Sequence, residues 1–276
     1  MPSLPQSARC QGFTLVEAIM VIVITGIIAG MIALFIRAPV QGYFDAARRA
    51  ELTDIADTAA RRMARDIRTA LPNSVRTTGT TFLEFYPTIA GGRYRREQNC
   101  TGACIGDVLG FSAPDNRFDV LGGITPAPAA GNRIVIYNNG TAAADAYALN
   151  NTGVVAAFAA SAITLNPAVQ FPFESPGNRF HVVTTPVTYS CNPGLTGGNG
   201  TGNLIRHQGY APANPQPTPP VGGTTSLLAS NVSACTFTYN AGGAAGRIAL
   251  VAIQLQITQE NETVTIYHEV HVDNVP

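Results

Sequence analysis

The chain has 276 residues, enough for one sizeable domain or two small ones together with a membrane segment. Its 17 basic residues, all of them arginine, balance 17 acidic residues, and this neutral charge argues against a dedicated nucleic-acid-binding protein. With 27 glycines and 19 prolines the chain exceeds the average without reaching a disordered composition, so we expect a folded domain with long loops.

The first predicted element is an apolar helix over residues 13–36, whose only charge is Glu17. A helix of this length can span a bilayer core, and no small-residue cleavage site follows it, so we expect a retained anchor rather than a signal peptide. A carboxylate at membrane depth is costly and needs a cationic partner. Glu17 is therefore either a functional residue or a tolerated acid that is neutralised by protonation.

A second, amphipathic helix is predicted over residues 37–72. Its apolar residues fall near helical spacing: Phe44, Ala47, Leu52, Ile55, Ala59, Met63, Ile67 and Leu71. Arginines on the opposite face are interrupted by acids, which indicates a solvated surface rather than a nucleic-acid site. Pro39 and Gly42 should kink the helix or loosen a turn, and Pro72 should end it.

The remainder, residues 73–276, reads as a β-rich domain. Short runs rich in Val, Ile, Thr, Phe and Tyr occur at residues 80–87, 132–138, 178–191 and 233–240. The clearest pair is at the end, where Val251, Ile253, Leu255 and Ile257 and then Val264, Ile266, Val270 and Val272 are predicted to face inward. Strands with one inward and one polar face favour a meandering antiparallel sheet with the helix on one side. Residues 194–203 and 210–223 are predicted loops. The fold class is α+β.

The cysteines indicate an oxidising compartment. Four of the five remain if the segment before Phe13 is removed, and only Cys100 and Cys104 have spacing close to a metal pair. We favour two disulfides, Cys100–Cys104 and Cys191–Cys235, over a zinc site.

No group of residues indicates catalysis. The sequence HEVH at residues 268–271 lacks the spacing of a metalloprotease helix, and on a strand His268 and His271 point to opposite faces, with His268 a hydrogen-bonded core or edge residue. His181 and His207 have no acid or nucleophile at a recognisable spacing. Asp107, Asp115, Asn116 and Asp119 could line a calcium loop, although they match no ligand template, and Arg93, Arg95 and Arg96 indicate an exposed loop. We expect no enzyme, no cofactor and no bound metal.

The stretch QGFTLVEAIMVIVI, residues 11–24, resembles the leader junction of type IV pilins and pseudopilins. In that family a prepilin peptidase cuts after the glycine, on the cytoplasmic side, and the new N-terminus is methylated. The resemblance implies a leader of residues 1–12, cleavage between Gly12 and Phe13, methylation of Phe13 and a role for Glu17 in subunit assembly. The new ammonium at Phe13 can pair with Glu17 at i,i+4 in its own helix or with Glu17 of a neighbouring subunit, which would fix axial register.

Further stretches, at residues 60–76, 175–191, 232–239 and 268–276, resemble the MshO-type minor pilins of mannose-sensitive haemagglutinin (MSHA) pili. This implies a single-pass inner-membrane protein with a periplasmic C-terminal domain. Its expected partners are the prepilin peptidase, other major and minor pilins, the inner-membrane assembly platform and membrane lipid. We favour a minor pilin that initiates the filament at or near its tip and supports surface attachment. The alternatives are a minor pseudopilin of type II secretion and a tip adhesin that binds a glycan or surface.

Overall fold

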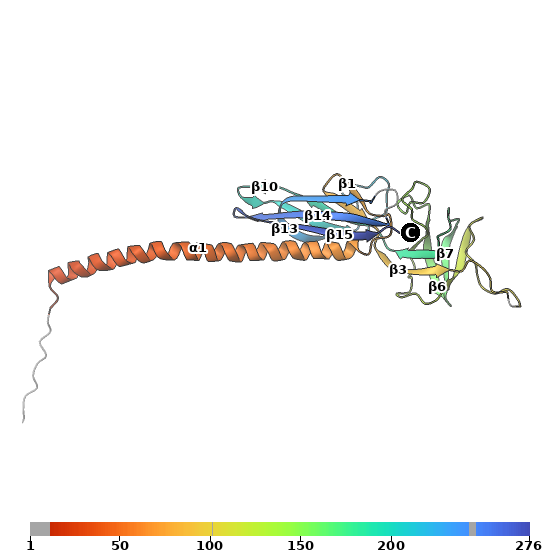
Figure 1. Ribbon diagram of the computed structural model, residues 1–276, viewed down its shortest axis with the longest axis horizontal. Coiled ribbons are helices and arrows are strands. Elements are labelled where there is room, and N and C mark those ends of the chain that lie inside the picture. The colour runs from red at the N-terminus through yellow and green to blue at the C-terminus, as the bar shows by residue number, and fades with distance from the viewer. Residues whose placement is uncertain (1–11, 101, 243–246) are drawn as a thin grey trace, which may run out of the picture. The chain divides into compact units, whose positions relative to one another are not determined.

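A computed structural model describes residues 12–100, 102–242 and 247–276, and the chain divides into two compact units, Met1–Ala50 and Glu51–Pro276. The described residues confirm the α+β class, because one long helix is followed by antiparallel strands (Figure 1). The helix, α1 (Leu15–Ile67), has 53 residues and contributes to both units. It runs through Pro39 and Gly42 without interruption, so the loosened turn expected there does not form. A proline removes one hydrogen bond of the helical ladder, and the bonds on either side continue the helix.

The second half of α1 packs against the sheet in the unit Glu51–Pro276. Leu52, Ala56, Ala59, Met63 and Ile67 are at most 2% exposed and belong to the main hydrophobic cluster. Their spacing of four, three, four and four residues places them on one face, as the amphipathic pattern predicts.

Two details of the predicted helix were wrong. Phe44 and Ala47 are exposed, so the buried face begins only at Leu52. The helix ends at Ile67 rather than at Pro72, because the chain has already turned to join the strands: Ala70 forms a bridge with Pro87.

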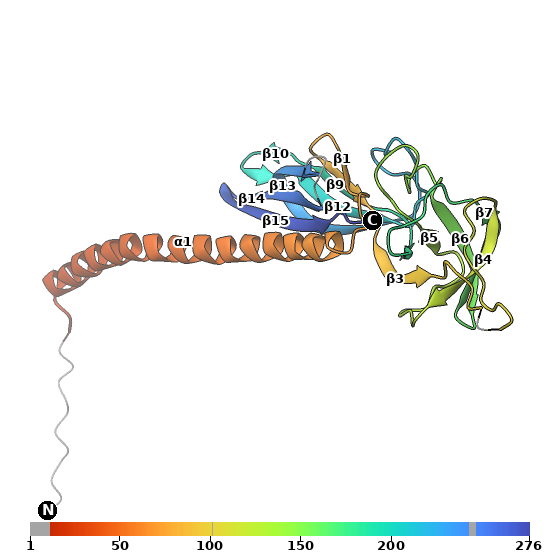
Figure 2. The same cartoon turned by 45° about the vertical axis from the view of Figure 1, so that its right-hand side comes forward.

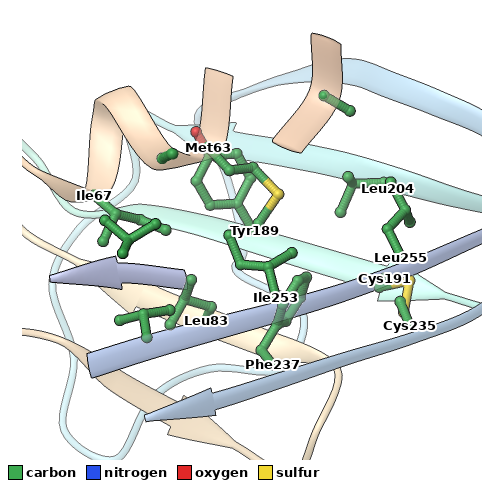
Figure 3. Close-up of a cluster of buried hydrophobic side chains, with 14 of the residues drawn as sticks. Met63, Ile67, Leu83, Tyr189, Cys191, Leu204, Cys235, Phe237, Ile253 and Leu255 are labelled. Carbon is green, nitrogen blue, oxygen red and sulfur yellow. A yellow bond between two sulfur atoms is a disulfide. The ribbon is translucent and has the colours of Figure 1, made fainter. Parts of the chain in front are cut away.

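Seven strands form an antiparallel sheet in the order β1-β2-β9-β12-β13-β14-β15 (Figure 2). They are β1 (Arg76–Thr78), β2 (Phe82–Phe85), β9 (Val187–Asn192), β12 (Gly202–Gln208), β13 (Thr224–Asn240), β14 (Ile248–Gln259) and β15 (Glu262–Asp273). The inward faces predicted for the last two strands are confirmed: Val251, Ile253, Leu255 and Ile257 are at most 1% exposed, while Val264, Ile266, Val270 and Val272 pack in or against the same cluster. Figure 3 shows Met63 and Ile67 of α1 beside Tyr189, Ile253 and Phe237 of the sheet.

Six further strands close into a barrel in the order β3-β4-β7-β6-β5-β8. They are β3 (Thr88–Tyr94), β4 (Asp115–Leu121), β5 (Arg133–Val135), β6 (Thr152–Ala159), β7 (Ala162–Val169) and β8 (Arg179–Val183). The expectation of a single sheet was therefore incomplete. Strands β4, β6 and β7 are rich in Asp, Asn and Ala, which have low strand propensity, and their burial depends on barrel partners far along the chain.

The segment after α1 contacts the chain between β5 and β6. The Asn138 side chain donates a hydrogen bond to the Pro72 carbonyl at 2.7 Å, and the Tyr147 hydroxyl donates one to the Ser74 carbonyl at 2.8 Å. Tyr86 and Tyr147 lie with ring centroids 4.8 Å apart in a small cluster with Leu71. The predicted loop at residues 210–223 is irregular, as expected, whereas residues 194–203 contain a short ribbon of β10 (Leu195–Thr196) and β11 (Asn199–Gly200) and the start of β12.

Candidate assembly site at the start of the helix

Thr14 caps the N-terminus of α1. Its side-chain oxygen accepts a hydrogen bond of 3.3 Å from the backbone N–H of Glu17, and its carbonyl accepts one of 3.1 Å from the N–H of Ala18. The order Thr-x-x-Glu is that of a capping box, in which a cap residue and an acid three positions later satisfy the free N–H groups of the first turn. Glu17 therefore lies in the first turn of α1, where the positive end of the helix dipole stabilises a carboxylate.

Gly12 and Phe13 lie outside the helix, immediately before the cap. The i,i+4 helical relationship expected between Phe13 and Glu17 was therefore wrong, because Thr14 takes the non-helical conformation of a cap residue. The bond between Gly12 and Phe13 lies in chain without regular secondary structure, and Phe13 is 75% exposed. This segment has the exposed, irregular backbone that a peptidase requires, and the carboxylate of Glu17 follows within one helical turn.

The helix beyond Glu17 is apolar on every side. Large apolar side chains from Leu15 to Ile36 are about half exposed or more, and none of the residues in this stretch is buried. By length and composition, α1 is the one helix among the described residues that is long and apolar enough to cross a membrane. Thr25, a polar residue in this stretch, donates its hydroxyl to the Val21 carbonyl at 2.6 Å and so needs no other partner. A helix without a polar face is stable only when lipid or other helices surround it.

The cysteines form two disulfides in the pairing that the sequence favoured. Cys191 and Cys235 are buried beneath α1 and join β9 to β13, with 6.5 Å between their Cα atoms. Cys100 and Cys104 close a small exposed loop between β3 and β4, where Asn99 and Ile105 exchange two backbone hydrogen bonds of 3.0 Å. The first disulfide fastens the sheet that supports the helix, and the second stabilises a loop tip.

One serine–histidine contact was missed by the sequence analysis. Ser190 Oγ lies 2.7 Å from His207 Nε2, because β9 and β12 pair side by side although 17 residues separate the two side chains in sequence. Burial lowers the pKa of His207, and no acid contributes to its environment. Without an acid to orient the imidazole, and with His207 only 8% exposed, this pair lacks the features of an activated nucleophile.

The other histidines and the suspected calcium residues are also placed. His268 faces inward and His271 outward, as predicted, but Nε2 of His268 is buried without a hydrogen-bond partner among the described residues, so its expected hydrogen bonding was wrong there. Asp119 pairs with Arg95 at 3.1 Å and Asp107 with Arg117 at 3.4 Å. These pairs use the carboxylates internally, and the part of the chain that the structure describes holds no cluster of His, Cys, Asp and Glu that fits a metal ion.

Of the three arginines predicted in an exposed loop, Arg93 and Arg96 are exposed, whereas Arg95 is partly buried. Arg93 belongs to β3, Arg95 is paired with Asp119, and Arg96 makes two hydrogen bonds of 2.6 and 3.0 Å to Glu174. Arg95 and Arg96 therefore link the segment after β3 to β4 and to the chain that follows β7.

Comparison with known proteins adds one match. Residues 7–33 match the family model described as the prokaryotic N-terminal methylation motif. No curated protein and no solved structure matches the chain. The motif, with the exposed apolar helix that it heads, supports membership of the type IV pilin and pseudopilin superfamily, whose members are processed by a prepilin peptidase and assemble with other pilins.

Proposed function

We propose that this chain is a minor pilin of an MSHA-type type IV pilus, a structural subunit rather than an enzyme. It is inserted in the inner membrane by residues 13–36, with the C-terminal domain in the periplasm. The prepilin peptidase removes residues 1–12, the new N-terminus at Phe13 is methylated, and the subunit joins the filament at or near its tip, where it starts assembly and supports surface attachment.

The observation that carries the proposal is the arrangement at the start of α1. The Gly12–Phe13 bond lies in irregular chain directly before a capped helix, Glu17 lies in the first turn, and the helix that follows is apolar all round. Glu17 needs a cation within hydrocarbon, and cleavage creates one at Phe13. Because Phe13 lies outside the helix, its ammonium is free to turn toward Glu17 of a neighbouring subunit.

The direct test is the intact mass of the membrane or filament form. Loss of residues 1–12 together with the gain of one methyl group is the expected result, and a chain that keeps residues 1–12 would refute the proposal. The type II secretion alternative makes the same mass prediction. Deleting the gene and measuring both surface piliation and protein secretion distinguishes the two functions. If the protein is a minor pilin, only piliation should fall.

A second candidate function, glycan binding at the filament tip, is favoured by one open cleft of about 430 Å³ in the β-rich unit. Its lining is rich in amide, carboxylate and phenol groups, which suit sugar hydroxyls; the polar side chains include Asn73, Asn139, Asp145, Asn214 and Tyr239. One wall is rigid, because the Arg76 guanidinium lies 3.6 Å from the Tyr147 ring centroid and pairs with the buried Glu84 at 2.5 Å.

Glycan-array binding of the purified protein tests this second function. Saturable binding that Asn139→Ala or Asn214→Ala abolishes would support it, and binding unchanged in both variants would remove the cleft from consideration.

A further inference from the structure

Two arginines lie directly opposite each other on the surface of the barrel. Arg93 of β3 and Arg179 of β8 are partners in the antiparallel register, and both side chains are exposed. The N–H of Tyr94 donates a hydrogen bond of 2.9 Å to the carbonyl of Asn178, so the next pair, Arg93 and Arg179, takes the position at which no hydrogen bonds are exchanged. Opposite side chains approach most closely there, with Cα atoms about 4.5 Å apart. The two guanidinium groups therefore leave the same face of the barrel side by side.

This arginine pair lacks the compensation that other arginines of the barrel have. Like charges directly opposite each other on neighbouring strands are destabilising. Three other arginines in this part of the chain each pair with an acid: Arg95 with Asp119, Arg96 with Glu174 and Arg117 with Asp107. Among the residues that the structure describes, neither Arg93 nor Arg179 makes an ion pair or a side-chain hydrogen bond. Two positive charges are thus held together without an acid between them.

The surface beside the pair is open. Gly91 lies two residues before Arg93, on the same side of β3, and is exposed opposite His181 of β8. A Cβ at Gly91 would lie 3.4 Å from the Phe180 carbonyl oxygen and 3.9 Å from Nδ1 of His181, so packing leaves room for a side chain there. With glycine at this position, a ligand can lie against bare backbone and contact both guanidinium groups.

The excess of positive charge is confined to this pair. The segment from β3 to β8, residues 88–183, contains six arginines and six acidic residues. A nucleic-acid site needs a basic stripe that follows many phosphates, and recognition of an anionic membrane takes a cluster of about four to eight basic residues. A pair of arginines on a neutral barrel instead suits one small anionic group.

We propose that Arg93 and Arg179 form a binding site for a sulfate or phosphate group. Each guanidinium presents a planar fork of N–H donors that matches two oxygens of such a group. Together they carry two positive charges, which a tetrahedral dianion neutralises and a single carboxylate does not. Binding therefore replaces the repulsion within the pair by charge-assisted hydrogen bonds.

The source of this group rests on the proposed function. A pilus subunit that supports attachment meets sulfate and phosphate esters on the glycans of the surfaces to which cells adhere. The lining of the polar cleft described above includes neither arginine, nor Gly91 or His181, so this is a second site with a different ligand chemistry. The cleft suits sugar hydroxyls, and the arginine pair suits the ester group of a charged sugar.

Binding of the purified full chain, in detergent, to immobilised polysaccharides tests the site. Dextran sulfate and dextran phosphate are compared with carboxymethyl dextran of equal substitution and with neutral dextran, at a fixed salt concentration of about 0.15 M. We expect saturable binding to at least one of the two esters, at least about tenfold tighter than to the carboxymethyl polymer, because only the dianion satisfies both guanidinium groups. Comparison of the two ester polymers identifies which group is preferred.

Substitutions that remove one charge at a time supply the controls. Arg93→Gln and Arg179→Gln should each weaken ester binding at least about tenfold. Arg96→Gln removes the same charge from an exposed arginine that Glu174 already pairs, and it should bind like the native chain. Asn214→Ala, in the polar cleft, should also bind the esters normally. Binding that persists in both pair variants, falls equally in Arg96→Gln, or is as strong for the carboxymethyl polymer would overturn the inference.

Thermal unfolding separates binding from a structural role. Without the ester, Arg93→Gln and Arg179→Gln should unfold at the native temperature or above it, because each relieves the repulsion; a clear decrease in both would show that the pair serves the fold and would overturn the site. The same variants should retain native piliation and the mature mass. Absence of ester binding by a chain that is processed and piliated normally therefore refutes this site alone, whereas a chain that keeps residues 1–12 refutes the proposed function.

Discussion

The Tyr189 hydroxyl, on β9, donates a hydrogen bond of 2.7 Å to the Asp66 carboxylate in the last turn of α1. Burial raises the pKa of Tyr189 far above its usual range, so the hydroxyl keeps its proton and remains a donor. Nε of Arg206, on β12, donates to the same carboxylate oxygen at 2.9 Å. One acid of the helix thus holds two strands that lie 123 and 140 residues further along the chain.

Replacing Asp66 tests this junction. Asp66→Asn leaves a weaker acceptor for Tyr189 and no counter-charge for Arg206, whose side chain is only 14% exposed. We expect a loss of about 1–3 kcal/mol in the free energy of unfolding. The measurement is denaturant unfolding of the full chain in detergent, followed by tyrosine fluorescence. Asp54→Asn, at an exposed position of the same helix, is the matched control and should change stability by no more than about 0.5 kcal/mol.

Removing the helix cap tests the structure around the cleavage site. Thr14→Ala deletes the acceptor for the Glu17 N–H, and we expect the first turn to lose about 1 kcal/mol of local stability. Amide hydrogen exchange at Glu17 and Ala18 in detergent micelles should become roughly fivefold faster. Thr14→Ser retains the hydroxyl and should exchange like the native chain; equal protection in all three would show that the cap contributes nothing.

The role of Glu17 in assembly is tested by measuring leader cleavage and pilus formation separately. Glu17→Ala removes the carboxylate without altering the Gly12–Phe13 bond, so we expect a mature chain of correct mass and strongly reduced piliation. Electron microscopy counts the pili and mass spectrometry reports the processing. Glu17→Asp, which keeps the charge on a shorter side chain, should retain part of the assembly. Native piliation in Glu17→Ala would contradict the pairing role.

The two disulfides should differ in their effect on stability. The Cys191–Cys235 bridge closes a separation of 44 residues, which in the chain-entropy description corresponds to about 4 kcal/mol. The Cys100–Cys104 bridge closes a separation of 4 residues and corresponds to about 2 kcal/mol. Unfolding of the two double-serine variants measures both, and a larger loss in the Cys100/Cys104 variant would contradict the order.

The buried histidines should make stability depend on pH. Burial, with a smaller contribution from Arg179, lowers the pKa of His181 in the fold, whereas an unfolded histidine titrates near 6.5. Between these two values the unfolded chain binds more protons, so stability is complete above about pH 6.5 and falls as the pH drops below it. His181→Gln should make this fall shallower, and the exposed His271→Gln should leave it unchanged. His207, whose pKa is also lowered, accounts for part of the remaining slope.

Local sequence patterns predicted the structure correctly where the interactions that determine it join residues close together in the sequence. The alternation in β14 and β15 predicted their buried faces, and the run from Leu52 to Ile67 predicted the face of α1 that packs on the sheet. Periodicity works in both cases because one continuous surface is buried, so every second or every third to fourth residue must be apolar. The cysteine count favoured the same two disulfides that the structure contains.

The sequence by itself determined the N-terminal segment of this protein: the Gly12–Phe13 junction, the acid at Glu17 and an apolar helix are properties of consecutive residues. The tertiary structure alone decided the six-stranded barrel, the Ser190–His207 contact and the attachment of Asp66 to Tyr189 and Arg206, because each depends on groups that only long-range strand pairing brings together.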